Sequence, residues 1–534
     1  MNTKINRIFC LLAVLLPVSL SAAQNKLEDK ALETMKKATQ YMMDEVSVGG
    51  GFVWTYLPDF SRQWGEMEAK RTMVWNQSPG TPQMGQILLD AYHATGDEYY
   101  YEAAKKVASA LIWGQLDCGG WNYVFDFAGE ASLKDWYATV GKSGWRLEEF
   151  QHYYGNATYD DSCTTECAQF LLRIYLEKYD PAFRPALDKA INFILESQYA
   201  CGGWPQRYPL KYDHPFQGRA DYSSFVTLND NVIPEIIDFL LRCYQTLGLQ
   251  SVKEPIYRAM YLSAILQQGE PYAGWADQYT VEDLKPAHAR SYEPVGINPG
   301  TTLRMVRQMM DYYRLTGDSR FLSGIPAALK FVESQRLPDS EAAKFNRRTS
   351  NPNAFLVPRF INPQTGLPHY VHREGSNVYN GRYFTNQDIS NTIGHYASAS
   401  WVDLKPYWEQ YEAIKAVPVE ELTKNSPLLS HDQVPLPKYY SVSQTGERPG
   451  NDQVKAIVDA LEGEGYWLSV LGNTSNPYKP GADTAPSKET KYVSTNVGDE
   501  YDTSPYRADG TQKCISTRDY ISKMSTLIRF IDKQ

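Results

Sequence analysis

Apolar residues recur every three to four positions along much of the chain. Ala103, Val107 and Leu111 form one such stripe, and Leu187 and Ile191 belong to another. Residues at this spacing lie on one face of an α-helix, while polar residues cover the opposite face. We therefore predict a fold dominated by amphipathic helices that bury their apolar faces against one another.

The predicted helices belong to an imperfect repeat. Asp97 and Asp180 each precede a helical stretch, and a glutamine follows each of them after 18 residues, at Gln115 and Gln198. Each glutamine begins the sequence Gln-x-x-Cys-Gly-Gly-Trp. Each unit therefore consists of a helix, a tight turn, a second helix and a glycine-rich loop. Hairpins that cannot bury their own apolar face must stack side by side.

Two weaker copies extend this repeat. Gln335 follows Asp318 by 17 residues but lacks the glycine pair, and residues 49–54 resemble an N-terminal relic. The pattern Gln-x-x-x-Gly-x-Trp also occurs in triterpene cyclases, which are α/α toroids, so it supports an architecture more than one chemistry. We predict an all-α dominated α/α toroid of repeated helical hairpins, with long loops that gather at one end and form a cleft.

The rest of the chain is less regular. Residues 336–400 are rich in Asn, Arg, Pro and Tyr, which predicts long loops with short strands. A last amphipathic helix is expected at 517–531. We predict a signal peptide at 1–23, a toroid catalytic domain at 24–400, and an extended Pro/Gly-rich arm at 401–534 whose final helix packs back on the toroid.

The N-terminus has the pattern of a secretory signal. Lys4 and Arg7 precede an apolar run at residues 8–20, and small residues follow at 21–23. This order predicts cleavage near Gln24. No later segment offers about 20 uninterrupted apolar residues, so no membrane span is predicted. We expect an exported protein that resides in the periplasm, at the cell surface or outside the cell.

Charge and aromatic content narrow the classes of partner. The chain has 62 Asp and Glu against 53 Lys and Arg, a formal net charge of −9. An acidic chain does not suggest a nucleic-acid partner. An acidic ligand would need a locally basic site or a metal cation. The 39 Tyr and 12 Trp have two explanations, packing between helices or stacking on sugar rings, and packing is favoured for most of them.

Two acidic clusters precede predicted helices. Asp160 and Asp161 stand before a helix that begins near Thr164, and Asp230 stands before a helix at 232–244. Asp is a good N-terminal cap, so capping alone explains either cluster. Carboxylates that meet from two hairpins could also bind a calcium ion or act as a general acid and base.

Basic residues gather in two later segments. Lys285, His288 and Arg290 lie within six residues in a Pro- and aromatic-rich stretch, which favours a rigid, exposed loop. Arg373 and Arg382 flank the second segment. Arginine binds a sugar carboxylate through paired hydrogen bonds. For the first segment, a solvated surface loop is the favoured explanation. For the second, ordinary surface salt bridges are the alternative to a role in binding.

Four motifs resemble family 10 pectate lyases in their order and approximate spacing. They are Thr-x-Asp-Asp-x-x-Thr-Thr at 158–165, Trp-Pro-Gln-Arg-Tyr-Pro at 204–209, Leu-Asn-Asp-Asn at 228–231, and Gly-Trp-Ala-Asp-Gln-Tyr at 274–279 followed by Lys-Pro-Ala-x-Ala-Arg-x-Tyr-Glu at 285–293. Each motif alone is weak, whereas four in order are fairly specific. The resemblance covers roughly residues 85–385.

The resemblance implies an α/α toroid that cleaves polygalacturonate or a related uronate polymer by β-elimination. It implies that Arg290 is the base that removes the C5 proton. It implies that calcium is the cofactor, held by Asp160, Asp161 and Asp230. It implies substrate contacts from Arg207, Lys285, Tyr292, Arg373 and Arg382.

The sequence departs from the family pattern at two places. Asp161 stands where we expect Asn in the family, so the roles of the two adjacent acids could be exchanged. A stretch resembling Gly-Thr-Asn-Arg is here Gly-Ser-Asn-Val at 375–378, which predicts that one substrate arginine is missing.

Other functions stay open at this point. A metal-independent glycoside hydrolase on the same toroid would use Asp160 or Asp161 with Asp230 as acid and base. A non-catalytic protein that binds pectic glycans would keep the cleft without turnover. A terpene cyclase shares the repeat, but export and the basic segments count against it. The expected partner is an acidic polysaccharide, such as polygalacturonate or pectic fragments, and we expect a monomer.

Overall fold

A computed structural model gives the fold of most of the chain. The described residues are 26–142, 150, 152–211, 213–216, 218–345, 349–374, 382–390, 392, 398–429, 436–443, 447–472 and 511–532. The predicted signal peptide at residues 1–23 lies outside them.

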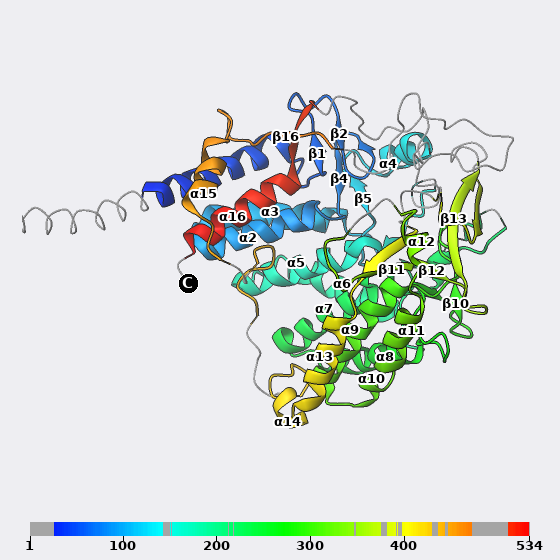
Figure 1. Cartoon of the computed structure of the whole chain (residues 1–534). Coiled ribbons are helices and arrows are strands. Elements are labelled where there is room, and N and C mark those ends of the chain that lie inside the picture. The colour runs from blue at the N-terminus through cyan, green and yellow to red at the C-terminus, as the bar shows by residue number, and fades with distance from the viewer. Residues whose placement is uncertain are drawn as a thin grey trace, which may run out of the picture.

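Helices dominate the described residues (Figure 1). Besides a helical segment at 26–41, they are α2 (Thr81–Thr95), α3 (Glu98–Gly114), α4 (Glu130–Trp136), α5 (Cys163–Lys178), α6 (Arg184–Glu196), α7 (Val232–Leu247), α8 (Lys253–Ile265), α9 (Pro299–Thr316), α10 (Arg320–Ser323), α11 (Ile325–Ser334), α12 (Asp339–Ala342), α13 (Lys405–Ala416), α14 (Val419–Leu422), α15 (Asn451–Asp459) and α16 (Thr517–Ile531). Short 3-10 turns include η3 (Asp160–Ser162) and η5 (Asn229–Asn231).

The helices pair into consecutive hairpins, which are α2–α3, α5–α6, α7–α8 and α9 with α10 and α11. The first helices of neighbouring hairpins pack together, α2 on α5 and α5 on α7. The second helix of a hairpin also contacts the next hairpin, α3 on α5 and α8 on α9. Figure 1 shows these hairpins side by side across the molecule. The predicted α/α toroid architecture of repeated helical hairpins is confirmed.

A glutamine after each of the first three hairpins joins it to the next. The side-chain amide of Gln115 donates to the carbonyls of Gly119 and Ala186, the second of which lies in α6. Gln198 donates in the same way to the carbonyls of Gly202 and Pro255, the second of which lies in α8. Each amide therefore closes its own loop and ties it to the outer helix of the following hairpin.

The sequence pattern missed the third member of this set. Gln267 donates to the carbonyls of Ala273 and Gly324, and the Gly274–Trp275 pair follows it. Its spacing to the tryptophan is two residues longer than in the other copies, which hid the match. Gln335 instead ends the fourth hairpin.

The glycine pair of the repeat is required by close packing. Gly119 and Gly202 have φ of +101° and +106°. A Cβ atom on Gly119 would lie 2.3 Å from the carbonyl oxygen of Lys189, and one on Gly202 would lie 2.6 Å from that of Arg258. Gly50 meets the carbonyl of Lys106 in the same way, at 2.3 Å. The relic at 49–54 therefore occupies the same position against α3 that the later loops occupy against α6 and α8.

Short strands complete the hairpin loops and the C-terminal half. They are β1 (Thr55–Tyr56), β2 (Gln63–Trp64), β3 (Glu68–Ala69), β4 (Met73–Trp75), β5 (Val124–Asp126), β6 (Ala157–Thr158), β7 (Arg207–Tyr208), β8 (Val226–Thr227), β9 (Gln278–Tyr279), β10 (Pro286–Ala287), β11 (Phe355–Pro358), β12 (Phe360–Ile361), β13 (Pro368–Glu374), β14 (Arg382–Asn386), β15 (Ala399–Val402), β16 (Ser469–Val470) and β17 (Lys513–Ser516). The predicted loops with short strands at 336–400 correspond to β11–β15.

The C-terminal segments pack on the first hairpin. Helix α16 lies against α2, and β17 pairs antiparallel with β1. Backbone amides of Tyr440, Ser441 and Val442 donate to the buried Asp90 of α2. The domain boundaries at residues 23 and 400 stay predictions. None of the helices in the described part of the chain is long and apolar enough to cross a membrane.

Candidate active site

Two matched junctions carry the predicted acidic residues. Turn η3 precedes α5 and turn η5 precedes α7, and the two turns contact each other. Asp161 and Ser162 have positive φ in η3, and Asp230 and Asn231 have positive φ in η5. Asp and Asn tolerate this left-handed backbone better than most residues. Because the two turns share this backbone geometry, the carboxylates of two neighbouring hairpins lie at the same end of the toroid.

A buried ion pair links the first junction to a later loop. Nη2 of Arg290 lies 2.7 Å from Oδ2 of Asp160, and the two side chains are 2% and 1% exposed. The same Asp160 oxygen accepts a hydrogen bond from the hydroxyl of Tyr123. Nη1 of Arg290 lies 3.1 Å from Oε2 of Glu293. Arg290 therefore lies between two carboxylates, and Tyr123 contacts one of them.

The other two acids have amide partners. Asp161 accepts a hydrogen bond from Nε2 of Gln77, which also lies 3.1 Å from Oε2 of Glu66. Asp230 accepts one from Nδ2 of Asn229 at 2.5 Å. Burial, followed by the negative charges of Asp160 and Asp161, raises the pKa of Asp230 well above its ordinary value. Asp230 therefore holds a proton at pH values where an exposed Asp has lost it.

The donor types at these junctions suit a hard cation, because calcium prefers carboxylate and amide oxygens. Among the described residues, however, no three Asp, Glu, His or Cys side chains stand together as a ligand set. Asp160 is paired with Arg290, and Asp161 is bonded to Gln77. A bound calcium ion would thus need side chains to turn, or oxygens from substrate and water to complete its shell.

Arg207, one of the predicted substrate residues, is almost completely buried. It lies in β7 and is 1% exposed, with its guanidinium 5.1 Å from the ring centre of Tyr123 and 4.4 Å from that of Tyr154. Within the described residues, neither Nη1 nor Nη2 has a hydrogen-bond partner. Cation–π contact with the two rings offsets part of the cost of burying this charge.

The remaining predicted substrate residues differ in exposure. Tyr292 is 1% exposed and its ring lies 5.3 Å from that of Tyr383 in β14. Lys285 is exposed and pairs with Asp283. Arg382 begins β14 and is exposed. The backbone of Arg373 pairs with that of Tyr383, but its side chain lies outside the described residues, as do residues 375–378.

The loop that carries Arg290 differs from the expected exposed loop. Ala289, Arg290, Ser291 and Tyr292 are all buried, at 5% exposure or less. The aromatic and proline content that suggested an exposed turn instead packs the loop against the junctions. Only the segment around Lys285 and Glu282 fits the prediction.

Tyr123, Gln77 and Glu293 belong to the site but were not predicted. Tyr123 follows the repeat tryptophan Trp121 by two residues, and its backbone carbonyl accepts from the amide of Asn76, just before α2. Two residues after each of the other repeat tryptophans, a backbone carbonyl likewise accepts a hydrogen bond from an amide that lies just before α5 or α7. The repeat places the residue two positions after each Gly-Trp pair against the segment before a hairpin. That position in the repeat could therefore have identified Tyr123 from the sequence.

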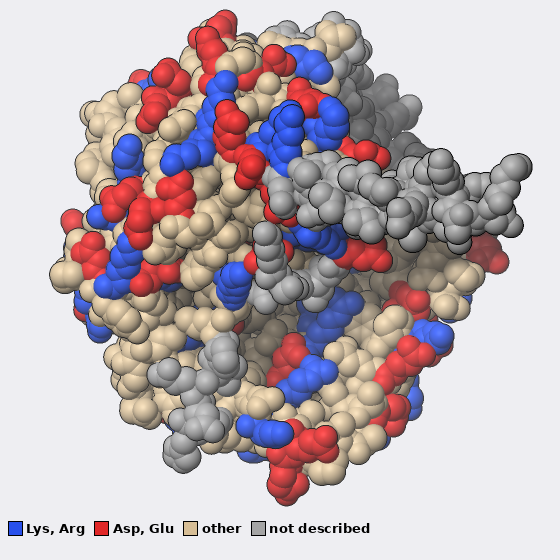
Figure 2. Space-filling model, turned by 90° about the vertical axis from the view of Figure 1, so that its left-hand side faces the viewer, with Lys and Arg blue, Asp and Glu red and all other residues tan. Residues whose placement is uncertain are grey.

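The surface charge is mixed on the face at the left of Figure 1. Figure 2 shows Lys and Arg interspersed with Asp and Glu over the described part of that face. Neither sign forms a continuous area there.

Stacked helical hairpins with carboxylates and an arginine at one end define this protein as an α/α toroid with a charged site at its loop end. Residues 133–388 match the model of the family described as pectic acid lyase. The resemblance to family 10 pectate lyases is confirmed, and the protein is a polysaccharide lyase. The matched region includes Asp160, Asp230 and Arg290 but not Tyr123 or Gln77.

Solved structures give more distant similarities. A variant of the family 10 polysaccharide lyase from Cellvibrio cellulosa, in complex with trigalacturonic acid, is 18% identical over 61% of this chain and 96% of that chain, with a TM-score of 0.40. Cellobiose 2-epimerase from Spirochaeta thermophila is 11% identical over 96% and 98% of the two chains, with a TM-score of 0.41. No curated protein matches the chain.

Proposed function

We propose that this protein cleaves polygalacturonate, or a related uronate polymer, by calcium-assisted β-elimination with Arg290 as the base. The observation that carries the proposal is the buried pair of Arg290 and Asp160 beside Asp230, at the loop end of a pectic acid lyase domain. A buried ion pair contributes little to stability on average. Stability alone therefore does not account for this pair, and a role in the chemistry of the site explains it better.

β-Elimination removes the C5 proton of a uronate and expels the oxygen at C4. The C5 proton is only weakly acidic, so negative charge that develops towards the C6 carboxylate must be stabilised. A bound calcium ion, held by Asp160, Asp161 and Asp230, would stabilise that charge. The residues of this chain supply the base and its orientation.

Arg290 must be uncharged to accept the C5 proton, whereas a free arginine has a pKa above about 12. Its neighbours Asp160 and Glu293 favour the charged guanidinium. We infer that Asp160 leaves Arg290 when the site is occupied, which weakens that preference. Because loss of the guanidinium proton is easier at high pH, activity is expected to rise towards alkaline pH.

Tyr123 and Arg207 support this arrangement. Tyr123 holds the Asp160 oxygen that also contacts Arg290, and Arg207 lies over the Tyr123 ring. Arg207 would reach a sugar carboxylate only if one of its covering rings moved. Contacts to substrate from Lys285, Tyr292, Arg373 and Arg382 remain part of the proposal.

Export to the periplasm or cell surface is also proposed, and it rests on residues 1–23 alone. An acidic polysaccharide outside the cytoplasm is the substrate class that fits a pectic acid lyase domain. We retain the expectation that the protein is a monomer without a nucleic-acid partner.

A metal-independent glycoside hydrolase is the second candidate function. The raised pKa of Asp230 favours it, because a general acid must keep its proton near neutral pH. Analysis of the product separates the two functions. A lyase leaves a 4,5-unsaturated uronide, whereas a hydrolase leaves two saturated ends. A protein that binds uronate polymers without either product is a non-catalytic binder.

A further inference from the structure

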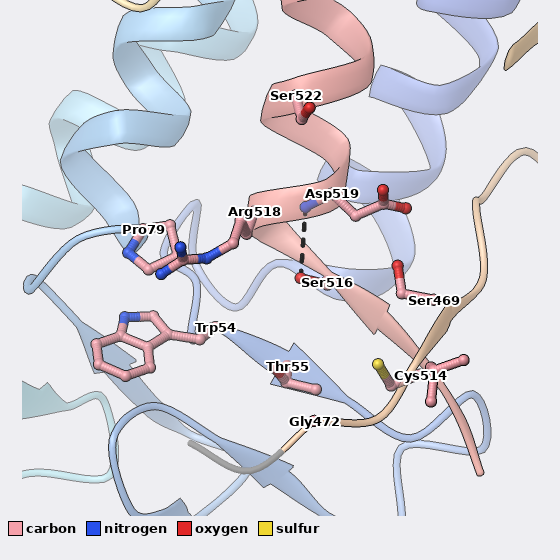
Figure 3. A pocket seen from close by; sticks show the side chains of 11 residues that line it. Trp54, Thr55, Pro79, Ser469, Gly472, Cys514, Ser516, Arg518, Asp519 and Ser522 are labelled. Carbon is pink, nitrogen blue, oxygen red and sulfur yellow. Dashed lines mark hydrogen bonds between the residues drawn. The ribbon is translucent and has the colours of Figure 1, made fainter. Parts of the chain in front are cut away.

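A pocket separate from the candidate active site lies beside the first hairpin (Figure 3). It has a volume of about 650 Å³ and is formed by β1, β16, β17, the start of α16 and the loop that precedes α2. We call it the Trp54–Arg518 pocket. Its walls include Trp54, Thr55, Pro79, Ser516, Arg518 and Ser522.

Arg518 supplies a positive charge to this pocket. It is exposed in the first turn of α16, and within the described residues it has neither an ion pair nor a hydrogen bond. Asp519 beside it is already paired with Lys523. Figure 3 shows the guanidinium of Arg518 lying towards Pro79 and Trp54, away from the Asp519 carboxylate. An exposed guanidinium that points into a pocket is suited to bind a carboxylate ligand.

Trp54 supplies an aromatic wall. It is half-buried, and its Nε1 donates to the carbonyl of Gln77 at 2.7 Å. Its ring meets that of Trp75 edge to face at 6.1 Å. These two contacts fix the indole, so a ligand would meet an ordered apolar surface. The C–H face of a sugar ring stacks on such a surface, and the hydroxyls of Thr55, Ser516 and Ser522 suit the sugar hydroxyls.

Gln77 connects this pocket to the candidate active site. Its carbonyl accepts from Trp54, and its side-chain amide donates to Asp161. A single residue therefore lies between the Trp54–Arg518 pocket and the acidic junction. A polymer bound at the junction would need only a short extension to reach the pocket.

We propose that the Trp54–Arg518 pocket is an additional subsite for a uronate residue of the acidic polysaccharide. The sugar ring stacks on Trp54, and its carboxylate binds Arg518. This inference rests on the proposed function for its substrate class. Trp54 and Arg518 both lie outside the matched region 133–388, so the subsite is a feature of the flanking segments of this chain.

The test is direct binding to the full chain by titration calorimetry. The probes are polygalacturonate and fully methyl-esterified polygalacturonate, with calcium chelated so that no cleavage proceeds. Arg518→Ala is expected to weaken binding of polygalacturonate about three- to tenfold, as loss of one charge-assisted contact implies. Binding of the esterified polymer, which has no carboxylate charge, should change less. Arg518→Lys should restore part of the loss.

Lys330→Ala is the matched control, because Lys330 is an exposed cation on α11, far along the chain of hairpins. Equal affinity of Arg518→Ala and the wild-type chain for polygalacturonate would overturn the subsite. If the two affinities are equal and the wild-type chain still forms the lyase product, the subsite is rejected but the proposed function stands. Conversely, a chain without lyase product whose binding depends on Arg518 would keep the subsite and reject the lyase.

Discussion

Arg290 and Asp160 form an ion pair at 2.7 Å with both side chains at 2% exposure or less, although 130 residues separate them in the chain. The repeat brings them together, because η3 ends one hairpin loop and the Arg290 segment folds back over it. Charges this deeply buried are expensive to remove from water, so each partner depends on the other.

Replacement of the proposed base tests the role of Arg290. Arg290→Lys keeps a cation between Asp160 and Glu293 but moves the accepting nitrogen. We expect kcat to fall by about 10²–10⁴, the usual contribution of a general base. The initial rate of unsaturated product formation measures it. Arg173→Lys is the control, since Arg173 forms an equally buried pair with Asp90 away from the junctions.

If Arg290→Lys and Arg173→Lys lose activity to the same degree, the loss reflects folding and Arg290 is not the base. Near-ultraviolet circular dichroism should show native packing in both variants. The account requires activity loss in Arg290→Lys alone.

Tyr123→Phe tests the hydroxyl that holds Asp160. The ring remains over Arg207, and only the hydrogen bond to Asp160 is lost. We expect kcat to fall about tenfold with KM little changed, because one hydrogen bond of this kind contributes about 1–1.5 kcal/mol. Tyr137→Phe removes a buried hydroxyl that bonds Asn122 instead. Equal kcat values for the two variants would contradict a role for Tyr123 in orienting Asp160.

A buried glutamate predicts how stability depends on pH. Burial, followed by the charge of Glu235, raises the pKa of Glu166 from 4.5 to about 8. The folded state therefore binds this proton more tightly than the unfolded state. The stability that the proton contributes is present below pH 4.5 and is lost as pH rises through about 8.

Glu166→Gln should therefore flatten the pH dependence of the free energy of unfolding between pH 5 and pH 8, a window set by that pKa. The slope removed is at most about 1.4 kcal/mol per pH unit. Urea titrations at several pH values measure it. Glu102→Gln, at an exposed glutamate on α3, should leave the slope unchanged. An unchanged slope in Glu166→Gln would show that Glu166 titrates normally.

Gln267→Ala tests the third copy of the repeat. It removes two hydrogen bonds to carbonyls of the loop and of Gly324. We expect the free energy of unfolding to fall by about 1–3 kcal/mol. Within the described residues, Gln335→Ala removes one side-chain hydrogen bond, to the neighbouring Ser334, and should cost less than about 0.5 kcal/mol. Equal losses in the two variants would assign Gln335 to the repeat as well.

The hairpins were predictable because helical period and the Gln-Gly-Trp loops are local signals. The amphipathic helix expected at 517–531 is α16, in which Tyr520 and Met524 are buried. The copy at Gln267 escaped notice because its loop is longer. Its hydrogen bonds depend on three-dimensional geometry rather than on spacing.

The site was only partly predictable. Asp160, Asp230 and Arg290 stand in motifs, but Tyr123 and Gln77 act through partners that the repeat brings near from other hairpins. The buried state of the Arg290 loop was also hidden, because proline and aromatic residues suit an exposed turn and a packed loop alike. Whether such a segment is exposed or packed depends on tertiary contacts, which the local sequence does not reveal.

The most direct test of the central claim follows ultraviolet absorbance while the full chain is incubated with polygalacturonate at alkaline pH. One sample contains calcium and the other contains a chelator. The account predicts a rise in absorbance from a 4,5-unsaturated uronide in the calcium sample alone. No rise in either sample, with new saturated reducing ends in both, would contradict the lyase mechanism and support the hydrolase.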